Sequence, residues 1–257
     1  MPLHLTRRAA LLATLLTAAG AAHAGLVETI VAAKPSVLAV GTHDALDNPR
    51  FTFRGSGFVV GDGNLLVTNA HVLPDDGADS GNRRKTLAVV APRVGSGEVR
   101  TASVVRIDRT HDLALLRFEG SPLAALRLAE PKNIHEGASI ALMGFPIGSV
   151  LGLAPVTHRG IISSITAIAL PPANARQLNE RSVRALRDGA FELYQLDATA
   201  YPGNSGGPVL DADSGEVVGV VNMVLVRSTK ESALSNPTGI SYAIPARFVR
   251  ELIEQPR

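Results

Sequence analysis

Short apolar segments separated by turn residues run through most of the chain, and this alternation constrains the fold more than any other feature. The segments are rich in Val, Ile, Leu and Thr, and turn-forming stretches such as GDGN at 61–64 and DADSG at 211–215 separate them. Short runs of this composition predict β-strands, and their close spacing favours a sandwich or barrels over alternating β-α units. We therefore expect an all-β fold with strands at 36–41, 56–60, 65–68, 86–91, 99–108, 113–118, 139–143, 156–164, 191–196, 208–210, 217–223 and 239–244.

One helix is expected, at the end of the chain. Pro245 can open it, because proline is tolerated in the first turn of a helix. Apolar residues then recur at the spacing of a single helix face, at Phe248, Val249, Leu252 and Ile253.

Three stretches are expected to be connections. Residues 124–136 contain a proline and can join two halves of the chain. Residues 75–85 form a polar loop, and its basic run, RRK at 83–85, is expected to be a solvated face. The stretch 171–189, with a possible short helix at 179–186, is long for a connection between strands. Long loops of this kind are either functional or mobile.

Residues 1–24 resemble an export signal. Arg7 and Arg8 give a basic start, residues 9–22 are apolar, and AHA at 22–24 fits the small-x-small pattern of a cleavage site. The arginine pair raises the possibility of twin-arginine export, and the alternatives are an uncleaved anchor or a core helix. We expect cleavage after Ala24 and a periplasmic or secreted protein.

The composition of residues 25–257 excludes several classes of protein. Their 23 Lys and Arg balance 23 Asp and Glu, so the expected mature chain does not have the charge of a nucleic-acid binder. No later stretch reaches the roughly 18 unbroken apolar residues of a membrane-spanning helix. Because the chain has no Cys, disulfides, thiolate metal sites and a cysteine nucleophile are excluded.

The first motif that carries chemistry is GNSGGP at 203–208. A nucleophilic serine needs an exposed hydroxyl and backbone N–H groups that point at a developing oxyanion. Glycines suit such a loop, because they adopt unusual dihedrals and let the substrate approach the backbone closely. Taken alone, the segment could also be a tight turn between strands.

The second motif is TNAHV at 68–72, in which His71 follows an apolar strand. The unperturbed pKa of an imidazole lies close to neutral pH, as a general base requires. A histidine satisfied by local hydrogen bonds is the alternative. The four other histidines after residue 24 have no comparable context and form no His-x-x-x-His pair, so a zinc hydrolase is not expected: His43, His111, His135 and His158.

The third motif is HDLALLR at 111–117. Asp112 precedes an apolar strand, where it could be a turn residue or could accept a hydrogen bond from an imidazole. A carboxylate in that second role fixes the tautomer of the histidine and stabilises its imidazolium. His111 is a rival to His71 as the base, but it adjoins Asp112 and is poorly placed to reach the serine.

Together the motifs place His, Asp and Ser in that order along the chain. This is the order of chymotrypsin-type proteases, and it differs from the orders in subtilisins and α/β-hydrolases. The sequence resembles the trypsin-like serine proteases of the HtrA/Deg group. The resemblance rests on the three motifs and on PSV at 35–37, GSGF at 55–58 and GISYAIP at 239–245, and it extends from about residue 27 to the final helix.

The resemblance implies two six-stranded antiparallel β-barrels followed by a C-terminal helix. The first barrel would span about 36–123, the second about 137–245 and the helix about 246–254, all within one trypsin-like protease domain at 25–257.

The resemblance also implies the roles of the site residues. Ser205 would be the nucleophile, His71 the general base and Asp112 the residue that orients His71. The oxyanion hole would lie at Gly203, Asn204 and Ser205, with the N–H groups of Gly203 and Ser205 as donors. The substrate would be a polypeptide, and no metal or organic cofactor is implied.

The sequence departs from its relatives in three ways. Asn204 stands where digestive proteases carry the Asp that pairs with a newly cut N-terminus, so zymogen activation of that type is not expected. PDZ domains commonly follow the protease in this group, and capture of substrates by a PDZ domain is not expected here. The aromatic N-terminal residues through which many relatives trimerise are missing, so a monomer is favoured over a trimer.

The substrate pocket is implied by position. Thr199, six residues before the nucleophile, would form its floor, and Val221 and Met223 would line a wall. A neutral floor predicts cleavage after small or medium aliphatic residues, since an acidic floor is what selects Lys or Arg. Asp197 is the alternative floor, and it would reverse this preference.

The leading interpretation is an exported serine endopeptidase that acts on unfolded or damaged proteins. An esterase shares the triad chemistry but would need another fold and chain order. The non-enzyme alternative is a protease-like chaperone or binding protein with a normally inactive site. The complete set of His71, Asp112 and Ser205 argues against it, because a protein without catalysis has no physical need for all three.

Overall fold

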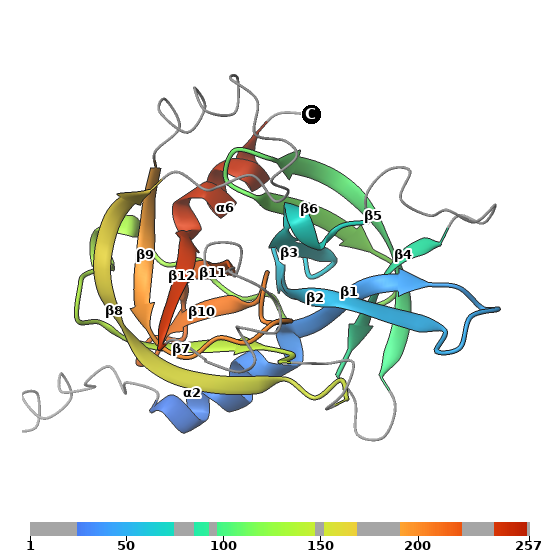
Figure 1. Ribbon diagram of the computed structural model, residues 1–257, viewed down its shortest axis with the longest axis horizontal. Coiled ribbons are helices and arrows are strands. Elements are labelled where there is room, and N and C mark those ends of the chain that lie inside the picture. Colours follow the sequence, from blue (N-terminus) through green and yellow to red (C-terminus); the bar gives the residue numbers. More distant parts are fainter. Residues whose placement is uncertain are drawn as a thin grey trace, which may run out of the picture.

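The computed structural model describes residues 25–74, 85–92, 97–146, 152–168, 191–222 and 239–255. Within these ranges the strands form two closed six-stranded antiparallel barrels that lie side by side (Figure 1). The all-β fold and the pair of barrels expected from the sequence are therefore confirmed. The segment 1–24, the polar stretch 171–189 with its expected helix, and all of the loop 75–85 except its last residue lie outside the described residues.

The first barrel closes in the order β1-β2-β3-β6-β5-β4. Its strands are β1 (Val37–His43), β2 (Phe51–Val60), β3 (Leu65–Asn69), β4 (Thr86–Ala91), β5 (Glu98–Asp108) and β6 (Leu113–Phe118). Strand β2 begins at Phe51, earlier than the expected residue 56, because its first residues still pair with the end of β1, for example Phe51 with His43.

The second barrel closes in the order β10-β11-β12-β9-β8-β7. Its strands are β7 (Ser139–Gly144), β8 (Val156–Ile168), β9 (Phe191–Asp197), β10 (Pro208–Asp211), β11 (Val217–Asn222) and β12 (Ile240–Pro245). The connection between the barrels, residues 119–138, contains a single short 3-10 helix at Pro131–Asn133.

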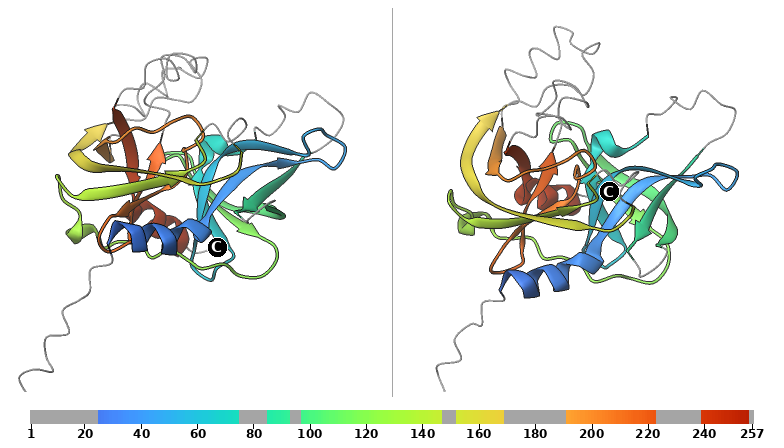
Figure 2. Two further views of the ribbon diagram at one scale, coloured as in Figure 1. Left: turned by 90° about the horizontal axis from the view of Figure 1, so that it is seen from below. Right: turned by 60° about the horizontal axis from the view of Figure 1, so that its bottom comes forward.

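The C-terminal helix α6 (Ala246–Glu254) follows β12 directly, as the sequence predicts. Its apolar face is buried at Phe248, Val249 and Leu252. The sequence predicted no helix before the first strand, but α2 (Leu26–Ala33) precedes β1. This helix lies along the second barrel (Figure 2), where the Thr29 hydroxyl donates to the carbonyl of Ala212 at 3.3 Å.

Three buried clusters organise the molecule. One fills the first barrel, around Leu38 and Leu116, and one fills the second barrel, around Ile140 and Leu196. The third draws on both barrels and on α6, so the barrels share a continuous apolar interface. This shared core holds the two barrels in a fixed arrangement, so residues from both can form one site. No helix in the described part of the chain is long and apolar enough to cross a membrane.

Candidate active site

Asp112 lies in the turn between β5 and β6 and has a left-handed backbone, with φ 52°. Asp is one of the few non-glycine residues that tolerate this region. In this conformation its carbonyl accepts hydrogen bonds from the N–H of Ala70 and from Nδ2 of Asn69, each at 3.0 Å. These two bonds tie the turn to the end of β3.

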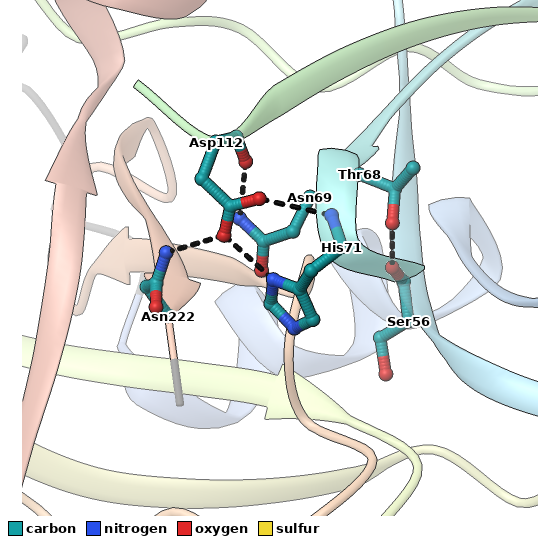
Figure 3. A network of polar contacts seen from close by, with 6 residues as sticks. All are labelled: Ser56, Thr68, Asn69, His71, Asp112 and Asn222. Atoms are coloured by element: carbon teal, nitrogen blue, oxygen red, sulfur yellow. Dashed lines mark hydrogen bonds and ion pairs between the residues drawn. The ribbon is translucent and has the colours of Figure 1, made fainter. Parts of the chain in front are cut away.

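His71 follows β3 in a 3-10 turn, Ala70–Val72. The Asp112 carboxylate holds it twice (Figure 3): Oδ1 accepts from the backbone N–H at 2.9 Å and Oδ2 lies 2.6 Å from Nδ1 of the ring. Because an ionised carboxylate can only accept, Nδ1 is the donor and the lone pair of the neutral ring is on Nε2. The side chains are only 14% and 15% exposed, so the pair is well shielded from water.

Asn222, at the end of β11, is a residue that the sequence analysis did not identify. Its Nδ2 donates to Oδ2 of Asp112 at 2.8 Å, and the residue is fully buried (Figure 3). Asp112 is thus oriented from the second barrel as well as from the first. The signal in the sequence was an amide at the end of an otherwise apolar strand, VVGVVN at 217–222.

Arg54 also holds the turn that carries His71, through hydrogen bonds to the backbone that follows this histidine. The guanidinium of this β2 residue donates from Nε to the carbonyl of Val72 at 2.6 Å and from a terminal nitrogen to the carbonyl of Leu73 at 2.8 Å. The backbone immediately after His71 is therefore fixed independently of the carboxylate.

Ser205 lies in the loop between β9 and β10 and is 6% exposed. The loop reaches across to the first barrel, where the Ser205 carbonyl accepts the N–H of Ser56 at 2.8 Å. A Cβ added to Gly206 would lie 3.1 Å from the backbone nitrogen of Asn69, so the serine loop adjoins the segment that leads to His71. Among these described residues no hydrogen bond joins the Ser205 hydroxyl to His71, and such bonds often form only in the substrate complex.

Two backbone N–H groups at and just before the serine have no acceptor among the described residues. Gly203 and Ser205 have no hydrogen-bond acceptor for their N–H groups within the described structure, whereas the N–H of Asn204 donates to the carbonyl of Tyr201 at 3.0 Å. The N–H of Asn204 is thus occupied, which argues against it as an oxyanion donor. Gly203 has φ 103°, a conformation that favours glycine.

The three residues expected to form the pocket have different surroundings. Thr199 is half-buried in the segment between β9 and the serine loop, Val221 is fully buried, and Met223 lies outside the described residues. Asp197, the alternative floor, lines a separate surface pocket together with Arg159 and Gly160.

His111 is engaged elsewhere. Its Nδ1 lies 2.5 Å from Oδ2 of Asp108, and its ring stacks on Phe248 of α6 with centroids 3.9 Å apart. The ring therefore packs against the C-terminal helix. Within the described residues, no three His, Cys, Asp or Glu side chains are grouped so that they could hold a metal ion.

His158 on β8 lies close to the serine loop, with its ring centroid 5.6 Å from that of Tyr201. Its Nε2 is buried without a hydrogen-bond partner. Burial disfavours the charged imidazolium and lowers the pKa of His158.

The chain is similar to several known proteins. Residues 55–220 match the family model of trypsin-like peptidase domains. "Serine protease HTRA2, mitochondrial" from Drosophila ananassae is 31% identical over 201 residues, which cover 78% of this chain and 38% of that relative. The protein of the same name from Bos taurus is 35% identical over 202 residues, covering 78% of this chain and 36% of the relative.

The chain therefore spans less than two fifths of the length of these curated relatives. Among solved structures, the serine endoprotease from Yersinia pestis matches with a TM-score of 0.61 and 24% identity, covering 89% of this chain and 65% of that one. This structural likeness supports the fold of the two barrels.

Proposed function

The chain belongs to the family of trypsin-like peptidase domains, and on this premise we propose that it is a serine endopeptidase. The observation that carries the proposal is the pair of hydrogen bonds between the Asp112 carboxylate and His71, one to the backbone N–H and one to Nδ1. A carboxylate bound in this way fixes the ring so that Nε2 is the free basic atom. A turn residue or a simple structural histidine would not require this double contact.

In the proposed reaction Ser205, His71 and Asp112 act as a triad. His71 Nε2 takes the proton of the Ser205 hydroxyl while Oγ forms a bond to the carbonyl carbon of the peptide. The oxyanion is bound by the N–H groups of Gly203 and Ser205, and the C–N bond breaks as His71 returns the proton to the leaving amine. Water, activated by His71, then hydrolyses the acyl-enzyme.

We propose unfolded polypeptides as the substrates and small or medium aliphatic side chains as the preferred residues before the cleaved bond. Half-buried, uncharged Thr199 supports such a pocket, whereas Val221 is fully buried in the core of the second barrel. The discrimination is expected to be loose, because one methylene in an apolar pocket changes binding by only about 1–3 kcal/mol.

Export is also proposed, on the signal-like segment at 1–24. Cleavage after Ala24 would leave Gly25 as the N-terminus. N-terminal sequencing of the protein from the extracytoplasmic fraction checks this, and an intact Met1 in that fraction would contradict it.

The proposed activity is tested with an active-site fluorophosphonate probe and with casein, each compared between the wild type and Ser205→Ala. We expect labelling and casein cleavage by the wild type and neither by the variant, since loss of a triad nucleophile costs on the order of a millionfold in turnover. Mass spectrometry of the digests should show most cuts after Val, Ala or Leu. A majority after Lys or Arg would favour Asp197 as the floor.

The alternative, a protease-like chaperone or binding protein with an inactive site, predicts a different result. Such a protein would suppress aggregation of unfolded casein without labelling or cleavage, and Ser205→Ala would behave like the wild type. Equal casein cleavage by a folded Ser205→Ala variant would also contradict the proposed nucleophile.

A further inference from the structure

Ser56 on β2 joins the two barrels through its hydroxyl and its backbone N–H. Its hydroxyl donates to the carbonyl of Gly203 at 2.6 Å and accepts the N–H of Phe145 at 3.0 Å. Its backbone N–H donates to the carbonyl of Ser205 at 2.8 Å, and its carbonyl accepts the hydroxyl of Thr68 at 2.7 Å (Figure 3). The residue is fully buried.

The two bonds from Ser56 to the serine loop flank Asn204. In a planar trans peptide the C=O and the N–H point in opposite directions, so fixing both fixes the plane of the peptide. The peptide between Gly203 and Asn204 is fixed in this way: its C=O accepts from Ser56, and its N–H donates to the carbonyl of Tyr201.

The next peptide, between Asn204 and Ser205, is held by the N–H of Gly207, which donates to the carbonyl of Asn204 at 2.9 Å. This bond directs the N–H of Ser205 to the opposite side, where it stays free. The free N–H of Gly203, in contrast, belongs to a peptide without such a bond. The φ and ψ angles of Gly203 set the orientation of this peptide relative to the Gly203–Asn204 peptide. Because Ser56 helps to fix the plane of the Gly203–Asn204 peptide, it also helps to set the direction of the Gly203 N–H.

The packing around Ser56 leaves the loop little freedom to move. A Cβ added to Gly206 would lie 2.2 Å from the carbonyl oxygen of Ser56, and one added to Gly144 would lie 2.8 Å from its hydroxyl. The side chain of Asn204 is buried with both polar atoms unpaired, so it contributes no hydrogen bond that could hold the loop in place of Ser56.

We propose that Ser56 is a positioning residue for the oxyanion hole: its hydroxyl, from the first barrel, orients the Gly203 N–H of the second. The inference rests on the proposed function and deepens it. At this position of β2 one hydroxyl both donates to the Gly203 carbonyl and accepts from the N–H of Phe145.

The test compares Ser56→Ala with a matched serine, Ser241→Ala. Ser241 on β12 is 1% exposed, and its hydroxyl also donates to a carbonyl, that of Ala198 at 2.7 Å, and accepts an N–H, that of Ala200 at 3.1 Å. Each variant loses one hydroxyl that donates to a carbonyl and accepts a backbone N–H. Ser241 holds the segment around Thr199, whereas Ser56 holds residues 203–205.

For a peptide amide with Val before the cleaved bond, Ser56→Ala should lower kcat about 10- to 100-fold with little change in KM. This is less than the roughly 100- to 1,000-fold loss on removing an oxyanion donor outright. The Ki of Ser56→Ala for a peptide boronate, whose hydroxyl occupies the oxyanion hole, should rise by the same factor as kcat falls. Ser241→Ala should act mainly on KM. Thermal unfolding and amide hydrogen exchange are measured on both variants.

Each outcome decides one of the two proposals. Wild-type kcat and boronate affinity in Ser56→Ala, with an active wild type, overturn the role of Ser56 and leave the protease assignment intact. An inert wild type overturns the protease assignment. In that case exchange at Asn204 and Gly207 still tests the positioning: faster exchange in Ser56→Ala but not in Ser241→Ala supports it, and equal exchange overturns it.

Discussion

At the scale of single residues, Asn222 offers a direct test of how Asp112 is oriented. Asn222→Ala removes the 2.8 Å hydrogen bond to the Asp112 carboxylate. A hydrogen bond to a charged group contributes about 1.5–3 kcal/mol, and a carboxylate free to rotate holds His71 less well. We expect kcat/KM for a peptide amide to fall roughly 10- to 100-fold, on the scale of that energy.

Asn64→Ala is the matched control, because Asn64 also donates from Nδ2 to oxygens of another segment, those of Phe118 and Gly120, but its side chain bonds no member of the triad. It should lower the melting temperature and leave kcat/KM close to wild type. Equal kcat/KM losses in the two variants would mean that Asn222 acts only through stability.

The single residues of the site differ in whether they can be identified from the sequence. His71, Asp112 and Ser205 stand in motifs because the chemistry demands these side chains in that setting, and the structure brings His71 and Asp112 within hydrogen-bond distance. Asn222 and Ser56 were missed, since each acts by a contact across the two barrels. The amide that ends the apolar run at 217–222 marks a polar position, but the local sequence does not specify its partner in the other barrel.

At the scale of elements, β8 carries a testable dependence of stability on pH. Burial lowers the pKa of His158 in the folded protein, whereas a histidine in the unfolded chain has a pKa of about 6.5. Below that pH the unfolded chain binds more protons than the folded one, so the free energy of unfolding falls as pH drops. Well above it, both states are neutral and the effect vanishes.

We therefore expect His158→Gln to flatten part of the loss of urea stability between about pH 7.5 and about pH 5.5. His135→Gln, a substitution of an exposed histidine, is the control and should follow the wild-type curve. Parallel curves for the wild type and His158→Gln would show that burial of this ring has no energetic consequence.

Elements were predictable where the pattern was local. Runs such as TLAVVA at 86–91 and LALLRF at 113–118 became strands with the expected bounds, because β-branched and apolar residues fill both sides of a buried strand. The helix α2 was missed, since its eight residues are stabilised by tertiary contacts: Thr29 bonds Ala212 of the second barrel, and Ala33 is buried in the cluster shared by both barrels. A helix this short depends on tertiary packing that its own sequence does not reveal.

At the scale of the whole molecule, α6 ties the two barrels together. It follows the last strand of the second barrel, yet its Phe248 ring stacks on His111 of the first barrel, and the Leu252 carbonyl accepts a hydrogen bond from Arg106 on β5. Phe248, Val249 and Leu252 also belong to the cluster shared by both barrels. A triad split between barrels needs such a tie, since any relative movement of the barrels would separate His71 from Ser205.

Leu252→Ala tests whether this tie makes the barrels unfold as one unit. Leu252 is fully buried, and the truncation of such a leucine costs about 2–5 kcal/mol. The three tyrosines, at 194, 201 and 242, report on the second barrel, and because the chain has no Trp, a Phe51→Trp background adds a probe for the first. We expect both probes to give one coincident urea transition, shifted equally to lower urea by Leu252→Ala. Separate transitions, or a shift confined to the tyrosines, would instead mean that α6 belongs energetically to the second barrel alone and that the interface aligns the triad without coupling the barrels' stability.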